Sequence, residues 1–137
     1  MLTGTYKLNS VARPGQYIAL VDGNIVGHSN RLPGVMIEWR VTFHEGVTGA
    51  ATFQPIRDGQ VSDEYIYFDK GNQSLIPSNK PWLFIVKENP RSSNFLSIGI
   101  YDTDLVSALL SWDDNTPLEI QPNTDATQQL WMFEKIV

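Results

Sequence analysis

Cysteine is absent from this chain of 137 residues. The fold therefore forms without disulfides, and neither thiol chemistry nor a cysteine-ligated zinc site is available to it. Basic charge is also scarce, because ten Lys and Arg stand against fifteen Asp and Glu, which gives a net charge of −5. The basic residues form no stripe, so no nucleic-acid partner is expected. The acidic balance favours solubility instead.

Long apolar segments are missing as well. No run of residues approaches the roughly 20 that a membrane-spanning helix requires, so no membrane partner is expected. Residues 1–5 include neither the basic segment nor the apolar segment of a signal peptide. We expect a cytoplasmic protein, and export by a route without a signal peptide is also compatible with the sequence.

The residues that are present form short alternating segments, which is the pattern of β-strands. Apolar residues occupy every second position in the segments 5–9, 39–44 and 96–100. A period of two places these side chains on one buried face. Clusters of Gly, Pro, Asn and Asp lie between the segments and predict turns. Only residues 104–111 have the spacing of a helical turn, and the predicted class is all-β.

A threefold repetition runs through the chain. Trp39, Trp82 and Trp131 each open a strand-like segment with a bulky apolar residue two positions later, after a turn that contains Asp and Asn. We predict a single domain over residues 1–137, with repeats of four strands at roughly 4–45, 50–88 and 94–137. One unit would leave sheet edges unpaired, whereas three units can close into a barrel. The three tryptophans are expected to fill its core.

The third repeat resembles the ricin-B-type β-trefoil lectins. It contains a Gln-x-Trp motif at 129–131, preceded by Asn-Thr-Asp-Ala at 123–126. Gly-Thr-Tyr at 4–6 and the segment 131–136 are similar to fungal members of this lectin-like family, which includes mushroom lectins and the light subunit of mushroom tyrosinase. The resemblance covers the whole chain and implies a β-trefoil of three pseudo-repeats. It also implies a carbohydrate-binding lectin or lectin-like protein without catalytic activity.

A sugar site requires a carboxylate and an amide for the hydroxyl groups, and an aromatic face for the C–H surface of the ring. In the third repeat, Asp102 and Asp104 follow the first strand, where the resemblance places the carboxylate. Trp112 is the candidate aromatic ring and Asn115 the candidate amide, while Gln129 is expected to supply orienting hydrogen bonds. The expected partner is a mono- or oligosaccharide.

The aromatic residue departs from the family pattern. The resemblance places it on the strand that here comprises residues 118–122, where no aromatic residue occurs, and Trp112 comes too early in the sequence. A galactose site of the usual kind is therefore not expected, and a mannose-type specificity is the alternative.

The turns of the first two repeats contain Asp22 with Asn24 and Asp69 with Asn72. As turn residues, they are suited to tight turns because they tolerate positive φ. As sugar ligands, they would supply a carboxylate and an amide to further binding sites. Both interpretations remain open at this point.

Catalysis and metal binding are not expected. The acidic pairs at 102/104 and 113/114 lack the spacing of a calcium-binding EF-hand loop. They also lack the context of a glycosidase, in which two carboxylates face each other across a cleft. The two histidines lie outside any known nucleophile motif. We predict that the protein is not an enzyme and needs no cofactor and no metal.

A protease inhibitor on the same fold is the alternative function. Inhibition requires a rigid exposed loop that imitates a substrate, and Arg31 or Arg91 would be its basic specificity residue. The loop at 45–49, where Kunitz-type trefoil inhibitors carry their reactive site, has no basic residue. A further alternative is a non-catalytic subunit whose partner is an enzyme on which it docks.

Overall fold

The computed structural model describes residues 1–30 and 32–136, and in them the chain is almost entirely β-structure. The only helical element of this part is a short 3-10 helix, Thr127–Gln129. The strands are β1 (Gly4–Ser10), β2 (Tyr17–Val21), β3 (Asn24–His28), β4 (Glu38–Phe43), β5 (Ala50–Arg57), β6 (Gln60–Val61), β7 (Tyr65–Asp69), β8 (Ser74–Ser78), β9 (Phe84–Asn89), β10 (Ser92–Ile100), β11 (Leu105–Ala108), β12 (Thr116–Pro117), β13 (Glu119–Pro122) and β14 (Trp131–Lys135).

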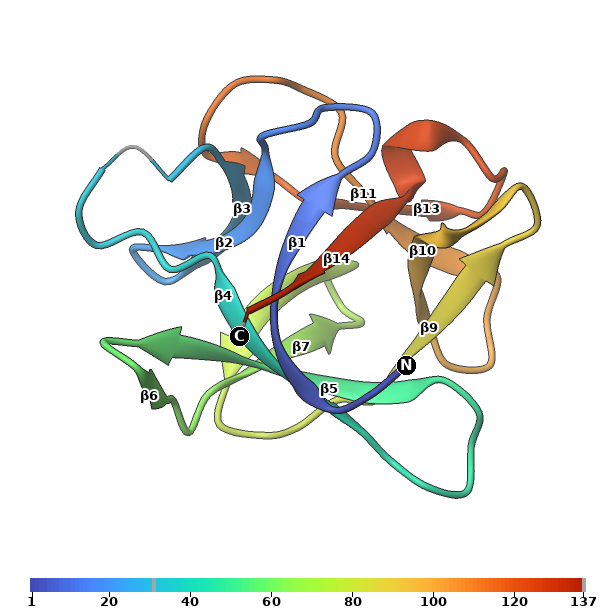
Figure 1. The fold of residues 1–137 in the computed structure, drawn as a ribbon, viewed down its shortest axis with the longest axis horizontal. Coiled ribbons are helices and arrows are strands. Elements are labelled where there is room, and N and C mark those ends of the chain that lie inside the picture. The colour runs from blue at the N-terminus through green and yellow to red at the C-terminus, as the bar shows by residue number, and fades with distance from the viewer. Residues whose placement is uncertain (31, 137) are drawn as a thin grey trace.

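Six strands close into a barrel. The order around it is β1, β4, β5, β9, β10 and β14, and β14 returns to pair with β1. Every neighbouring pair in this ring is antiparallel. Figure 1 shows β1 and β14 side by side at the front of the barrel. Closure pairs both edges of every barrel strand, which a single repeat could not do.

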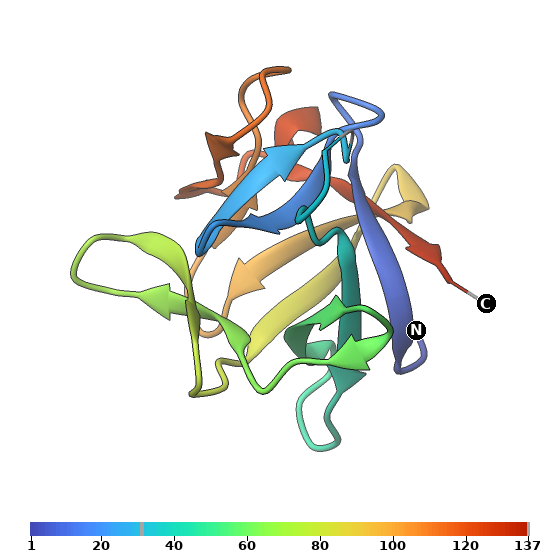
Figure 2. The ribbon, with the colours of Figure 1, turned by 90° about the vertical axis from the view of Figure 1, so that its left-hand side faces the viewer.

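Three hairpins extend from the barrel, one from each repeat. They are formed by β2 with β3, β7 with β8, and β11 with β13. Each hairpin lies in the sequence between two barrel strands of its own repeat, which gives the order barrel strand, hairpin, barrel strand three times. The hairpin β7–β8 forms a sheet of its own and projects at the left of Figure 2.

The strand register identifies the equivalent core residues of the three repeats. The last barrel strand of each repeat pairs with the first barrel strand of the next one, and the corresponding pairs are Trp39 with Pro55, Phe84 with Ile100, and Trp131 with Ser10. Trp39, Phe84 and Trp131 are almost fully buried. The prediction that Trp82 fills the second core position is therefore wrong, because Phe84 takes that place two residues later.

Trp82 lies before β9 and packs on the second hairpin. Its ring meets Tyr67 edge-on at a centroid distance of 5.0 Å and Phe68 at 5.9 Å. The Lys70 ammonium lies 5.7 Å from the centre of the same ring. The side chain is only half-buried at the margin of the core. In sequence position, Trp82 is the counterpart of Gln129, since each residue precedes the buried aromatic residue by two.

The segment 104–111, the single candidate for a helical turn, contains β11 instead. Its apolar residues Val106, Ala108 and Leu109 are buried against the core, and pairing with β13 holds the backbone extended. The three-residue 3-10 helix is the longest helical segment in the described ranges, and none there is long enough to cross a membrane.

The third hairpin differs from the other two in its connection. β2 and β3 are joined by a two-residue turn, whereas β11 and β13 are separated by residues 109–118. Within this long connection, β12 pairs with β3 of the first repeat. Residues of the third repeat thereby contact the first hairpin.

Candidate functional site

Gln129 braces the end of the third hairpin. Its side chain is almost fully buried, and its amide donates to the carbonyl of Pro122 at 2.9 Å and to Oε1 of Gln121 at 3.1 Å. Its Oε1 accepts from the backbone N–H of Thr124 at 2.9 Å. The Gln-x-Trp motif therefore fixes the end of β13 from inside, and Gln129 itself is not accessible to a ligand.

A groove begins beside this braced segment. The turn from β10 to β11 carries Tyr101, Asp102 and Asp104, and the backbone N–H of Asn123 donates to the carbonyl of Asp104 at 2.8 Å. All four residues are exposed and line the same groove, whose volume is about 1300 Å³. Tyr101 is 54% exposed, so its ring is accessible. The arrangement combines an aromatic face, two carboxylates and an amide, which are the groups that bind a sugar.

The two acidic residues are held in defined positions. Asp102 adopts a φ of 61°, in the left-handed region that Asp tolerates better than most residues. Thr103 donates from its hydroxyl to the carbonyl of Ile100 at 2.8 Å and accepts from the N–H of Leu105 at 3.0 Å. The turn is therefore ordered by its own hydrogen bonds while its carboxylates face solvent.

Trp112 and Asn115 lie in a different place from Asp102 and Asp104. They belong to the connection after β11, whereas the two acidic residues precede this strand, so the four residues of β11, about 13 Å of extended chain, separate the two groups. The N–H of Asn115 donates to the carbonyl of Gly27 in β3 at 2.9 Å. The sequence grouped these four residues into one site, but the structure leaves only the acidic pair in the groove.

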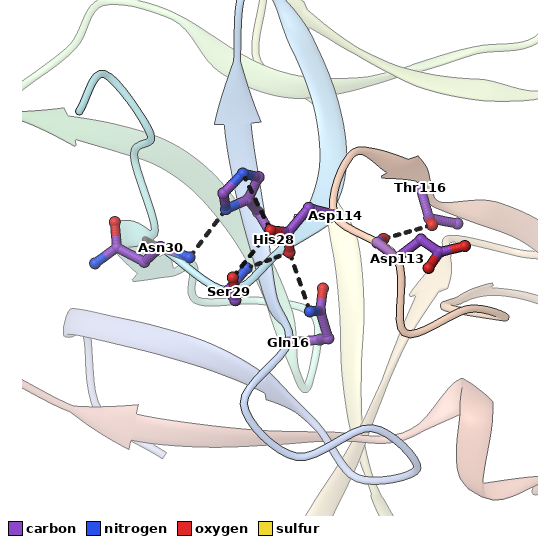
Figure 3. A network of polar contacts seen from close by, with 7 residues as sticks. All are labelled: Gln16, His28, Ser29, Asn30, Asp113, Asp114 and Thr116. Carbon is purple, nitrogen blue, oxygen red and sulfur yellow. Dashed lines mark hydrogen bonds and ion pairs between the residues drawn. The ribbon is translucent and has the colours of Figure 1, made fainter. Parts of the chain in front are cut away.

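A polar network joins the long connection to the first repeat (Figure 3). The Asp114 carboxylate accepts hydrogen bonds from the amide of Gln16 at 3.1 Å, from the N–H of Ser29 at 2.9 Å and from the hydroxyl of Ser29 at 3.0 Å. Nε2 of His28, which is almost fully buried, lies 3.7 Å from the same carboxylate. Nδ1 of His28 accepts from the N–H of Asn30 at 2.9 Å.

These contacts lower the pKa of Asp114. Partial burial acts to raise the pKa of this carboxyl, but the hydrogen bonds from Gln16 and Ser29, together with His28, outweigh it and lower the pKa below its ordinary value of 3.8. The network has a structural role, because it fastens the third repeat to the first hairpin.

The Asp and Asn residues of the first two hairpins make hydrogen bonds within their own turns. Asn24 donates from its side chain to the carbonyl of Asp22 at 3.2 Å. Asp69 accepts from the N–H of Gly71 at 3.1 Å and from the side-chain amide of Asn72 at 2.9 Å. These contacts support the turn interpretation, and a sugar-binding role for the four residues stays a prediction.

Sequence reasoning missed Tyr101 and Asn123 as site residues. Tyr101 is the first residue of the exposed turn after β10. Its position directly before Asp102 was visible in the sequence and could have identified the ring. Asn123 required the pairing of β11 with β13, which brings Asn123 next to Asp104.

The basic residue that the inhibitor hypothesis placed in a loop is engaged within the chain. Nε of Arg91 donates to Oδ1 of Asn89 at 3.2 Å, and Nη2 donates to the carbonyl of Asp125. A specificity residue must instead extend its side chain into the pocket of the protease, so this conformation does not favour inhibition through Arg91. Arg31, the other candidate, lies outside the described residues.

Residues 1–30 and 32–136 contain no group of three or more His, Asp or Glu side chains arranged to hold a metal ion.

Comparison with known proteins identifies the architecture. No family model matches the chain, and no curated protein sequence matches it. A ricin B-like lectin of Macrolepiota procera, solved with lactose, superposes with a TM-score of 0.82 over 99% of this chain and 98% of that one, at 17% identity. The Rhizoctonia solani agglutinin gives 0.79 over 99% and 97%, at 19% identity. ThreeFoil, a designed threefold-symmetric protein, gives 0.72 over 97% and 99%, at 12% identity.

The fold is a β-trefoil. The prediction of an all-β trefoil with three pseudo-repeats is confirmed by the closed barrel, the three hairpins and these superpositions. At identities below one fifth, the likeness concerns the path of the backbone. What the chain binds has to be argued from its own side chains.

Proposed function

We propose that this β-trefoil is a non-catalytic carbohydrate-binding protein and that the groove beside the third hairpin is its binding site. The observation that carries the proposal is the grouping of Tyr101, Asp102, Asp104 and Asn123 around one open groove. The fold adds support, since two of the solved structures with the same architecture are an agglutinin and a ricin B-like lectin, the latter in complex with lactose.

In this proposal each group has a distinct task. The carboxylates of Asp102 and Asp104 accept hydrogen bonds from neighbouring sugar hydroxyls, and the Asn123 side chain donates to a third oxygen. The ring of Tyr101 covers the apolar face of the pyranose. Gln129 acts as a positioning residue, because it holds the end of β13 from which Asn123 follows.

A mannose-type sugar is the proposed ligand. Residues 118–122 provide no aromatic side chain at the end of the third hairpin, and Tyr101 approaches the groove from the β10–β11 turn instead. Because the Tyr101 ring enters from this turn, it favours an orientation of the sugar that differs from the one expected in a galactose site of the usual ricin-B type. The site is shallow, so a single sugar should bind with a Kd between about 0.1 and 1 mM.

The test is isothermal titration with mannose, galactose, lactose and N-acetylglucosamine. Asp102→Asn should weaken binding of the preferred sugar at least tenfold. Asp58→Asn is the matched control, because Asp58 is also an exposed Asp at positive φ, 51°, but lies in the turn after β5. Neither variant should shift the melting temperature by more than a few degrees.

A second pair of variants separates the groove from the site that the sequence suggested. Tyr101→Ala should abolish binding, whereas Trp112→Ala should leave it unchanged, although Trp112 is equally exposed at 58%. Loss of binding in Trp112→Ala alone would move the site to the long connection. Absence of binding to every sugar would refute the carbohydrate proposal.

A further inference from the structure

The groove extends well beyond the residues that a single sugar would contact. Its opposite wall is the connection between β4 and β5, residues 44–49, and its floor is formed by β9 and β10. In Figure 1 this connection and the β10–β11 turn both lie on the lower right of the barrel. We propose that the groove is one continuous site for a linear oligosaccharide, with a second subsite against residues 44–49. This inference rests on the proposed function.

The floor follows the face of β9 and β10 that points away from the barrel core. Ile85 of β9 lies opposite Gly99 of β10, and Lys87 lies opposite Ser97. Residues paired in this way present their side chains on the same face of the sheet. Tyr101 follows β10 directly in the turn to β11 and lines the same groove, so the proposed stacking ring lies at one end of this floor. Gly99 is buried, and a Cβ at this position would lie 3.3 Å from the carbonyl oxygen of Leu105 and 3.7 Å from Cγ1 of Val106, so β11 borders the floor here.

The far wall is preformed. The N–H of Val86 donates to the carbonyl of Gly49 at 2.9 Å, and the N–H of Ala50 donates to the carbonyl of Val47 at 3.1 Å. Gly49 adopts a φ of +78°, and a Cβ at this position would lie only 2.4 Å from the carbonyl oxygen of Val86. Glycine therefore permits the connection to lie directly on β9, and the wall needs no rearrangement to meet a ligand.

The chemistry of this wall is suited to a further sugar unit. Val47 is 38% exposed and offers an apolar contact, and Lys87 and Glu88 of the adjoining floor bring one donor and one acceptor group to the same groove. A volume of about 1300 Å³ also exceeds the range of about 300–1,000 Å³ that is usual for a small-molecule pocket. A single pyranose at Tyr101 would leave the far wall, residues 44–49, without a ligand contact.

The experiment compares chain lengths. Mannose, galactose and N-acetylglucosamine are titrated next to the linear tetrasaccharide of each, with any affinity tag removed because Met1 also lines the groove. A tetrasaccharide offers up to four equivalent sugar units to a site that binds one unit, and this statistical factor alone raises the apparent affinity by at most about fourfold. A continuous site should raise it at least tenfold for the tetrasaccharide of the preferred sugar.

Val47→Arg tests the second subsite directly, because a long side chain there fills the far end of the groove. It should remove the gain for the tetrasaccharide and leave the Kd of the single sugar within twofold of wild type. Val61→Arg is the matched control, since Val61 is an exposed valine, at 49%, in β6 outside the groove. It should bind both ligands as wild type does.

The outcomes distinguish the two proposals. If single sugars bind and the tetrasaccharides gain less than fourfold, the extended site is refuted and the carbohydrate function stands. If Val47→Arg keeps the higher affinity for the tetrasaccharide, the second subsite is also refuted. If no single sugar and no tetrasaccharide binds, both proposals fail.

Discussion

Replacement of Trp39, Trp82 and Trp131, one at a time, by phenylalanine tests which of these three tryptophans belong to the barrel core. Trp39 and Trp131 are almost fully buried, and each indole N–H has a partner: the carbonyl of Ile18 at 2.8 Å for Trp39, and the hydroxyl of Ser107 at 3.2 Å for Trp131. Trp82 is half-buried, and its indole N–H, although buried, has no acceptor among the described residues. The three substitutions remove the same atoms from different environments.

At Trp39 and Trp131 two costs add. Removing the donor leaves a buried acceptor without its partner, which costs about 1–3 kcal/mol. The smaller ring also leaves a cavity of a few tens of Å³, which at about 24 cal/mol per Å³ contributes on the order of 1 kcal/mol. Trp39→Phe and Trp131→Phe should therefore each lower the free energy of unfolding by about 2–4 kcal/mol.

At Trp82 the same change removes a buried donor that has no acceptor, so the hydrogen-bond cost is absent or reversed. The phenylalanine ring can keep the edge-on contact with Tyr67, which is 5.0 Å away. Trp82→Phe should therefore change the free energy of unfolding by less than about 1 kcal/mol. Its difference from Trp39→Phe is the quantity to be measured.

Urea unfolding followed by far-UV circular dichroism is the appropriate assay, because tryptophan fluorescence is itself altered by the substitutions. The slope of the free energy against urea should stay constant across the series, so that midpoints report stability. If Trp82→Phe destabilises as strongly as Trp39→Phe, then Trp82 lies in the core and the register that places Phe84 there is incorrect.

Three further predictions concern the polar contacts. The lowered pKa of Asp114 means that the ionised carboxylate contributes about 1 kcal/mol to the free energy of unfolding, after allowance for exposure. This contribution is complete above pH 3.8 and is lost as the pH falls through the folded-state pKa, so the stability difference between wild type and Asp114→Ala should shrink in acid unfolding curves. A difference that stays constant with pH would contradict the network. Gln129→Leu should cost about 1–3 kcal/mol in urea unfolding, because it leaves the Pro122 carbonyl and the Thr124 N–H unpaired; no loss would refute its bracing role. EDTA should change neither the melting temperature nor sugar binding, and a large decrease in either would reveal a metal site.

The fold was predictable because its signal is repeated three times. Strand segments of period two occur around Tyr6, Phe53 and Ile98, and the side chains of all three residues are buried in the core. Only a closed arrangement pairs the edges of three such units, and this argument does not depend on any single residue. Errors at individual positions therefore left the predicted architecture intact.

The register of the second repeat was not predictable from the tryptophans alone. In that repeat, Trp82 occupies the sequence position of Gln129, and Phe84 occupies that of Trp131. Both second-repeat residues are aromatic, and a period of two fits either one to the inward face. The pairing of Phe84 with Ile100 distinguishes them, and this contact between the neighbouring strands β9 and β10 leaves no signature in the local sequence.

The site was only partly predictable, because the three repeats are not independent in space. Asp114 and Trp112 stand in the third repeat by sequence, yet β12 pairs with β3, and the Asp114 carboxylate is bound by Gln16 and Ser29 of the first repeat. A long hairpin connection can cross to a neighbouring repeat, and the strand pattern of the repeat to which it belongs in sequence does not change. Asp102 and Asp104 lie in a four-residue turn that cannot make such a crossing, so their position followed from the strand order. Residues in the short turns of a trefoil can therefore be assigned to a groove from sequence, whereas residues in its long connections require the structure.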